Sequence, residues 1–423
     1  MDEKLEKSLQ KIGAKLDLEE SARYSGAMLR HRLVKTAMDL LRMILVYSLC
    51  DCSLRMVGVW GTLMEVGSLS KTAILKRFRK CRRWLGMMIV VLLKFQNIHL
   101  PKHKGIRLRL IDATSVSQPG SHQTDWKVHL SFDLSHACIE EVQLADGKSV
   151  ETLTRFNFQT GDICLADRIY GRLVSLGVLL GGLTWFVIRI SWKNLPVQST
   201  EGQPFSISNW LRVQSTDPAA YPAQAKVWID TPHGRFPIRL IARTIPFEKA
   251  ERTRKRLLAE AKKKKRKVDE RTLLAAGFVV VVSNLPDVDW SPPQILELYR
   301  LRWQIELFFK RLKGIFQLDC LRAKDPELVQ VFLLAKILAA LLVCQIQLYI
   351  MEADPEIFQQ DHHPISLWRL TQAIFDLLRD TLRGYFTLSL FLKHWPQLER
   401  YLCDDPRHRI QQFTHARINL GIL

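Results

Sequence analysis

Two aspartates stand at positions where acidic residues are uncommon. Asp112 and Asp167 each end a short apolar strand, predicted at 106–113 and 162–167, where burying an unpaired carboxylate costs free energy. An aspartate that ends a single strand usually begins a turn, which is the commoner explanation for either one alone. Two aspartates at the same end of neighbouring strands are a stronger signal for a metal site, because a divalent cation needs converging oxygen ligands.

A third acid, Glu306, belongs to a long helix predicted over 291–312. Tyr299, Arg302, Glu306 and Lys313 follow one another at offsets of three, seven and fourteen residues from the tyrosine. On a regular helix these offsets fall within a stripe about 60° wide, so the four side chains would point the same way. An exposed salt-bridge face has similar spacing, and spacing alone favours that simpler interpretation.

The segment YRLRWQIELFFKRLK, which contains these four residues, resembles the Tyr-x2-Arg-x3-Glu-x6-Lys signature of bacterial DDE transposases of the IS-four type. IDATSV around Asp112 and LADRIYG around Asp167 resemble the two aspartate motifs of that family. VVVVSNLPD at 279–287 resembles the strand that precedes its glutamate helix. The resemblance covers roughly residues 105–325. One departure is Ala113, because family members commonly carry glycine after the first aspartate.

The resemblance implies an α/β fold, namely a ribonuclease H-like mixed sheet with a mostly β insertion before the glutamate helix. It also implies that two Mg²⁺ (or Mn²⁺) ions are held by the acids and promote phosphoryl transfer on DNA. The catalytic and metal-binding residues would then be Asp112, Asp167 and Glu306.

The same resemblance suggests DNA contacts around the glutamate helix. Arg302 and Lys313 resemble phosphate clamps, since arginine grips a phosphate bidentately and lysine acts as a point charge. Tyr299 would donate a hydrogen bond to the same backbone. Trp303 either stacks on an unpaired base or packs against the insertion, and the sequence favours neither.

The composition agrees with a nucleic-acid partner. The chain has 423 residues, with 62 Lys and Arg against 42 Asp and Glu, so its formal net charge is +20. Such an excess favours a polyanion, either nucleic acid or an anionic membrane surface. The N-terminus has no secretory pattern, and the eight cysteines form no C-x-x-C pair. We therefore expect a reduced, cytoplasmic bacterial protein without a zinc site, associated with the nucleoid when bound to DNA.

Membrane insertion is the weaker alternative. The longest apolar stretch, 329–350, is interrupted by Lys336. A lysine within lipid would be costly, so this stretch is predicted to be a buried core helix.

Periodicity predicts how the chain is organised. Residues 1–100 read as a helical DNA-binding region, in which helices at 53–64 and 70–85 suggest a helix-turn-helix; a plain bundle with a basic face is the alternative. The catalytic domain is predicted from 101–190 and 278–324, the insertion from 191–277, and a helical C-terminal region from 325–423. Further strands are expected at 126–134, 138–144, 184–190, 225–229, 236–243 and 278–283.

The densest basic cluster is the run Lys262–Lys267, placed on a helix predicted over 247–274. A charge run is usually a solvated face. Because the insertion lies beside a predicted DNA-processing site, we expect Lys263, Lys264 and Lys267 to contact phosphates.

These observations together predict a transposase. It would bind the terminal inverted repeats of its own element as double-stranded DNA, cut at the element ends and join them to target DNA. A homodimer is expected, because two ends must be brought together in a synaptic complex. Two alternatives stay open: a non-catalytic DNA-binding protein, such as a domesticated transposase or repressor, and a structure-specific nuclease without strand transfer.

Overall fold

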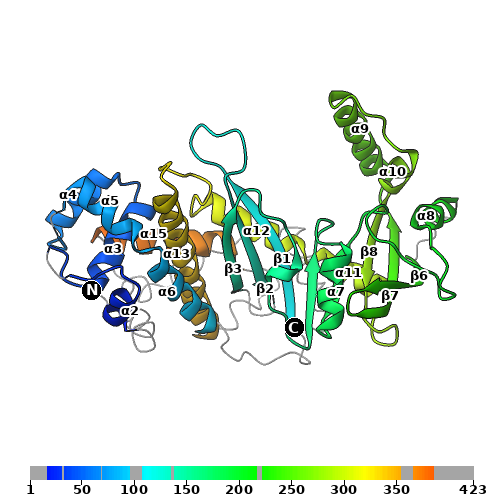
Figure 1. Ribbon diagram of the computed structural model, residues 1–423, viewed down its shortest axis with the longest axis horizontal. Helices are drawn as coiled ribbons and strands as arrows, with labels where there is room; N and C mark the ends of the chain where they lie inside the picture. Colours follow the sequence, from blue (N-terminus) through cyan, green and yellow to red (C-terminus); the bar gives the residue numbers. More distant parts are fainter. Residues whose placement is uncertain are drawn as a thin grey trace.

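A long central sheet separates a helical region from a projecting helical arm in the computed structural model (Figure 1). The helical region lies at the left of the view, and α9 projects at the right. The structure describes residues 17–30, 33–67, 69–95, 107–134, 138–216, 222–353 and 365–384.

The first five strands form the mixed half of the sheet. Within the described residues the strand order is β3-β2-β1-β4-β5-β8-β7-β6. Strands β1, β2 and β3 are antiparallel neighbours, whereas β4 lies parallel to both β1 and β5. This arrangement confirms the predicted mixed α/β class. The bounds are Arg107–Val116 (β1), Trp126–Asp133 (β2), Cys138–Asp146 (β3), Asp162–Ala166 (β4) and Trp185–Arg189 (β5).

The segment predicted to be an insertion, 191–277, continues the same sheet through β8, the strand that follows it in the predicted catalytic domain. Strand β8 pairs antiparallel with β5, and a hairpin of β6 and β7 extends the sheet beyond β8. The described residues of this segment, 191–216 and 222–277, also carry three helices, so the segment is less purely β than we expected. Whether it is a separate domain stays a prediction. The bounds are Ala223–Thr231 (β6), Gly234–Thr244 (β7), Phe278–Ser283 (β8), Ile207–Thr216 (α8), Phe247–Lys263 (α9) and Glu270–Ala275 (α10).

Each face of the sheet has its own apolar core. One face packs with α7 (Leu173–Gly181), whose buried leucines belong to the same apolar core as Ile111 and Ala166. The other face packs with α11 (Pro292–Arg300) and α12 (Trp303–Gly314). The two cores decide which strand residues face which helices, because successive side chains on a strand alternate between faces.

The helical region packs around one long apolar helix, α13, which spans Pro326–Ala353. Helices α3, α5, α6 and α15 all contact α13, and α6 and α13 also contact β3. The part of 1–100 and 325–423 that is described is therefore helical, as predicted. The remaining bounds are Leu18–Tyr24 (α2), Ala37–Leu49 (α3), Leu54–Leu63 (α4), Lys71–Arg79 (α5), Arg82–Phe95 (α6), Leu153–Arg155 (3₁₀ turn η2) and Leu367–Arg383 (α15).

Helix α13 is the core helix that the sequence predicted. Among the described residues it is the one helix long and apolar enough to cross a membrane, and most of it is buried inside the protein. Lys336 is 2% exposed; its Nζ atom donates to the carbonyl oxygen of Gln317 at 2.5 Å and lies 4.3 Å from the ring centroid of Phe332. Burial lowers the pKa of Lys336 to about 7.

A buried ion network joins the strands at the start of β1 and β4. Asp162 accepts from Arg107 Nε at 2.7 Å and from Arg109 Nη1 at 3.2 Å. Arg109 also donates to Glu141 at 2.6 Å and to Ser131 at 2.8 Å. Since Arg109 and Asp162 are almost inaccessible, loss of either partner leaves an unpaired buried charge.

We therefore expect Asp162→Ala to lower the free energy of unfolding by about 3–5 kcal/mol. Glu248→Ala is the control, because it removes an exposed pair with Arg252 and should change the free energy by less than about 1 kcal/mol. Urea unfolding followed by tryptophan fluorescence measures both. Equal effects of the two substitutions would show that the buried network does not hold β1 to β4.

Candidate active site

The register of three strands brings the two aspartates side by side. Ile111 on β1 pairs with Ala166, the last residue of β4, so Asp112 on β1 lies beside Asp167, the first residue after β4. The sequence placed Asp112 at the end of its strand, which is wrong: β1 continues to Val116. The extra residues stay extended because they pair with β2 alone, beyond the point where β4 ends.

Both aspartates face the same helices. Leu110 and Leu165 belong to the core on the α12 side, whereas Ile111 and Ala166 belong to the core on the α7 side. Alternation along the strands therefore directs Asp112 and Asp167 toward α12.

The helix that carries Glu306 is interrupted. We expected one helix over 291–312, but α11 ends at Arg300 and α12 begins at Trp303. Between them Leu301 N bonds to Leu298 O at 3.1 Å, which is a 3₁₀ turn. Leu298 and Leu301, on either side of the turn, are both buried in the same core, which keeps the turn against the sheet.

The signature residues nevertheless converge around this turn. Arg302 Nη2 lies 2.5 Å from Glu306 Oε1, and its guanidinium lies 5.8 Å from the ring centroid of Tyr299. At the other end of α12, Lys313 Nζ donates to the carbonyl oxygen of Ser115 on β1 at 3.4 Å. Helix α12 thus lies along β1 with its glutamate end toward the aspartates (Figure 1).

The pKa of Asp112 reflects the charges of these neighbouring residues. Burial raises the pKa of Asp112 to about 7, while the bond from the Ala113 N–H opposes this shift. The charges of Asp167 and Glu306 raise this pKa further, and Arg302 lowers it. The three acids and Arg302 are therefore within electrostatic reach of one another.

These residues fit a hard divalent cation. Asp167 and Glu306 both raise the pKa of Asp112, so a bound cation would relieve the repulsion among these carboxylates. Asp112 Oδ1 accepts from Ala113 N and Asp167 Oδ1 accepts from Ile169 N, both at 2.8 Å. These bonds fix each carboxylate and use one oxygen of each. Within the described ranges, no three acidic, histidine or cysteine side chains are already gathered as a metal site.

Sequence reasoning missed Arg189. The register pairs Ala166 with Ile188, so Arg189 is the next residue after Asp167 across the sheet. It lowers the pKa of Tyr299, a group whose pKa burial raises. Arg189 could have been found from the sequence, because a single cation at the end of a buried strand indicates a functional residue, as the aspartates do for β1 and β4.

Trp303 lies on the surface of α12. Its side chain is 42% exposed, which leaves part of the indole open to an unpaired base. The choice between base stacking and packing against the insertion stays a prediction.

The lysine run differs from its predicted setting. The single helix expected over 247–274 is wrong, because α9 ends at Lys263 and α10 begins at Glu270. Lys265 adopts a left-handed backbone with φ 50°, and successive like charges disfavour further helix. Lys263, Lys264 and Lys267 are exposed at the tip of the arm formed by α9 and α10.

The predicted helix-turn-helix consists of α4 and α5, and its second helix is shorter than expected. Ser70 Oγ accepts from Ala73 N at 3.3 Å and caps α5, as predicted. The helix expected to reach residue 85 instead ends at Arg79, and α6 begins at Arg82. Part of the basic face forms an ion pair within the protein, since Arg79 pairs with Asp325 at 2.5 Å.

Comparison with known proteins decides the family. Residues 103–342 match the family described as Transposase DDE domain. The chain belongs to the DDE transposases of insertion sequences. It is 38% identical over 339 residues to the putative transposase InsL for insertion sequence element IS186A of Escherichia coli (strain K12), covering 78% of this chain and 90% of that one.

More distant members show the same relationship. The transposase for insertion sequence element IS421 of Escherichia coli is 37% identical over 340 residues, which is 78% of this chain and 91% of that one. The transposase for IS231F of Bacillus thuringiensis subsp. israelensis is 26% identical over 266 residues, which is 56% of this chain and 55% of that one. The mixed sheet is accordingly the ribonuclease H-like fold of a DDE transposase.

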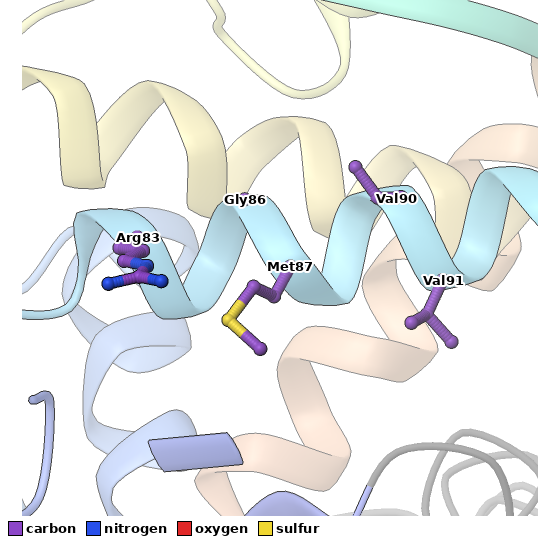
Figure 2. A pocket seen from close by; sticks show the side chains of 5 residues that line it. All are labelled: Arg83, Gly86, Met87, Val90 and Val91. Carbon is purple, nitrogen blue, oxygen red and sulfur yellow. The ribbon is translucent and has the colours of Figure 1, made fainter. Parts of the chain in front are cut away.

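A separate apolar groove runs along α6, away from the acids. Figure 2 shows Arg83, Met87 and Val91 at this groove, with Gly86 and Val90 on the same helix. A methyl group added at Gly86 would meet no atom within 4 Å.

The turn after Asp167 provides a test of the site's geometry. A Cβ atom at Gly171 would lie 2.6 Å from the carbonyl oxygen of Arg189, so Gly171→Ala should shift this turn and cost about 1–3 kcal/mol of stability. A displacement of about 1 Å can cost 10²-fold in rate, so DNA cleavage should fall steeply.

Gly86→Ala is the matched control. It should stabilise α6 by about 0.5–1 kcal/mol and leave cleavage unchanged. Thermal unfolding and cleavage rates are measured on both variants. Normal stability and cleavage for Gly171→Ala would show that this contact does not position Asp167.

Proposed function

We propose that this transposase binds the terminal inverted repeats of its insertion sequence, cleaves at the element ends and joins them to target DNA. The observation that carries the proposal is the strand register, which sets Asp112 beside Asp167 and directs both toward the helix of Glu306. Membership of the DDE transposases supports DNA as the substrate.

In this proposal Asp112, Asp167 and Glu306 hold two Mg²⁺ (or Mn²⁺) ions. When bound, such ions activate a water or a DNA 3′-hydroxyl and stabilise the leaving 3′-oxygen. The backbone N–H bonds to Asp112 Oδ1 and Asp167 Oδ1 keep these carboxylates oriented. Glu306 approaches from α12 on the same side of the sheet.

The cations around the acids position the DNA backbone. Arg302 binds a phosphate near the cleaved bond, and Lys313 binds a phosphate beside the end of β1. Tyr299 donates a hydrogen bond to the same strand, and Arg189 adds positive charge at the end of β5. Trp303 stacks on a base that the distorted DNA end exposes.

Recognition of the repeats is assigned to α4 and α5. The exposed cations of α5 are suited to phosphate contacts, and its N-terminal end is suited to the major groove. Two protomers, each bound to one end, form a homodimer in the synaptic complex. The reaction takes place on DNA in the bacterial cytoplasm.

The two rival functions predict different activities. A domesticated repressor needs no acids, whereas here the carboxylates of all three motifs are present. A nuclease without strand transfer would cut the same DNA but leave unjoined 3′ ends, which a strand-transfer assay detects directly.

The main test replaces each acid by its amide. Asp112→Asn, Asp167→Asn and Glu306→Gln should each reduce Mg²⁺-dependent cleavage of an element end below about one-hundredth of the wild-type rate, since a charge-bearing ligand is lost. DNA affinity should be retained, because phosphate contacts elsewhere supply most of it. Glu297, which pairs with Arg300 on α11, provides the control, Glu297→Gln, which should cleave normally. Cleavage by Glu306→Gln at the wild-type rate would contradict the three-acid site.

The lysine run is tested by salt dependence. Replacing Lys263, Lys264 and Lys267 with Gln keeps helix propensity similar. If these residues contact phosphates, the slope of log affinity against log salt should become shallower by roughly one to three units. Lys148→Gln, at an exposed turn after β3, should not change the slope. An unchanged slope for the triple variant would make the run a solvated surface that acts only through long-range attraction.

A further inference from the structure

Arg302 places a positive charge next to the acidic residues of the site. Its Nη2 atom lies 2.5 Å from Glu306 Oε1. Its charge also lowers the pKa of Asp112, which Asp167 and Glu306 both raise. A guanidinium at this position therefore offsets part of the repulsion that a metal ion would otherwise offset.

The environment of Arg302 is suited to a second, competing partner. The side chain is 16% exposed, against 33% for Glu306, so the pair is shielded from bulk solvent. Its Nε atom is buried and has no hydrogen-bond partner within the described part of the chain. A buried donor without a partner costs free energy, and a phosphate oxygen would satisfy it as part of a bidentate contact.

The carboxylates themselves are not yet assembled. Among the residues that the structure describes, no three of the metal-ligating types are gathered around one point. Glu306 Oε1 accepts a hydrogen bond from Arg302 Nη2 instead of contributing to such a site. A guanidinium at Glu306 Oε1 offsets part of the negative charge of this carboxylate and so weakens its attraction for a metal ion, which means that the two cations compete.

We propose that Arg302 is a placeholder cation that keeps Glu306 from the metal until DNA binds. A backbone phosphate of the element end draws the guanidinium away, and the freed Glu306 completes the metal site. Metal binding and DNA-end binding are then positively coupled, which prevents the assembled site from acting without its substrate. This inference rests on the proposed function and adds the order in which its site is assembled.

The test measures Mn²⁺ binding to the full-length, DNA-free protein by titration calorimetry. Arg302→Gln removes the competing charge and should tighten Mn²⁺ binding by about tenfold, a typical size for a group that contacts a metal ligand. The matched control is Arg300→Gln. Arg300 precedes Arg302 by two residues, and its Nη1 atom pairs with Glu297 Oε1 at 2.7 Å. That variant should bind Mn²⁺ as the wild type does.

A double-mutant cycle shows whether the gain acts through Glu306. In the wild-type background Glu306→Gln should leave Mn²⁺ binding to the DNA-free protein nearly unchanged, because Arg302 already holds that carboxylate. In the Arg302→Gln background the same substitution should abolish the gain. The comparison of Glu306→Gln with the wild type does not depend on the folding of any Arg302 variant.

Adding a duplex that carries the element end completes the test. The duplex should raise Mn²⁺ affinity more in the wild type than in Arg302→Gln, in which no placeholder remains to be displaced. The proposal is overturned if Arg302→Gln binds Mn²⁺ no more tightly than Arg300→Gln, or if Glu306→Gln weakens Mn²⁺ binding in the DNA-free wild type. Loss of cleavage in Glu306→Gln alongside either result would leave the proposed function intact. Normal cleavage by Glu306→Gln would instead overturn both.

Discussion

The hydrogen-bond register of β1, β4 and β5 is the constraint on which the site depends. It places Asp112 on β1, Asp167 directly after β4 and Arg189 on β5 at corresponding positions across the sheet. Because alternate residues of these strands belong to opposite cores, all three side chains face α11 and α12. A slip of one residue would turn each of them toward α7. Arg109 on β1 and Asp162 on β4 form a buried ion pair that opposes such a slip.

Helix α12 supplies the rest of the site because it is anchored along its length. The ring of Phe308 lies 4.9 Å from that of Phe132 on β2, between centroids. Lys313 contacts the backbone of β1 at the far end of the helix. Glu306 therefore stays on the aspartate side of the sheet. A small movement of the Arg302 side chain can free Glu306 without any movement of α12.

Much of the fold was predictable from the sequence, and the failures concern breaks within helices, the end of β1 and contacts between distant segments. The apolar strands, the capped start of α5 and the core helix around Lys336 all follow from local patterning. The 3₁₀ turn before Trp303 interrupts a segment whose apolar spacing is regularly helical, so periodicity alone does not predict it. The pairing of Arg79 with Asp325 joins positions far apart in the chain, so no local pattern predicts it. Residues 1–16, 96–106, 354–364 and 385–423 of the predicted regions lie outside the described residues.

The central claim is that three carboxylates distant in sequence share one metal site. Fe²⁺ substituted for Mg²⁺ in the complex with an element end generates hydroxyl radicals that cut the backbone next to the bound ion. The account predicts cuts in three separate segments, around Asp112, Asp167 and Glu306, all suppressed by excess Mg²⁺. Cuts confined to one segment, or cuts that Mg²⁺ does not suppress, would contradict it.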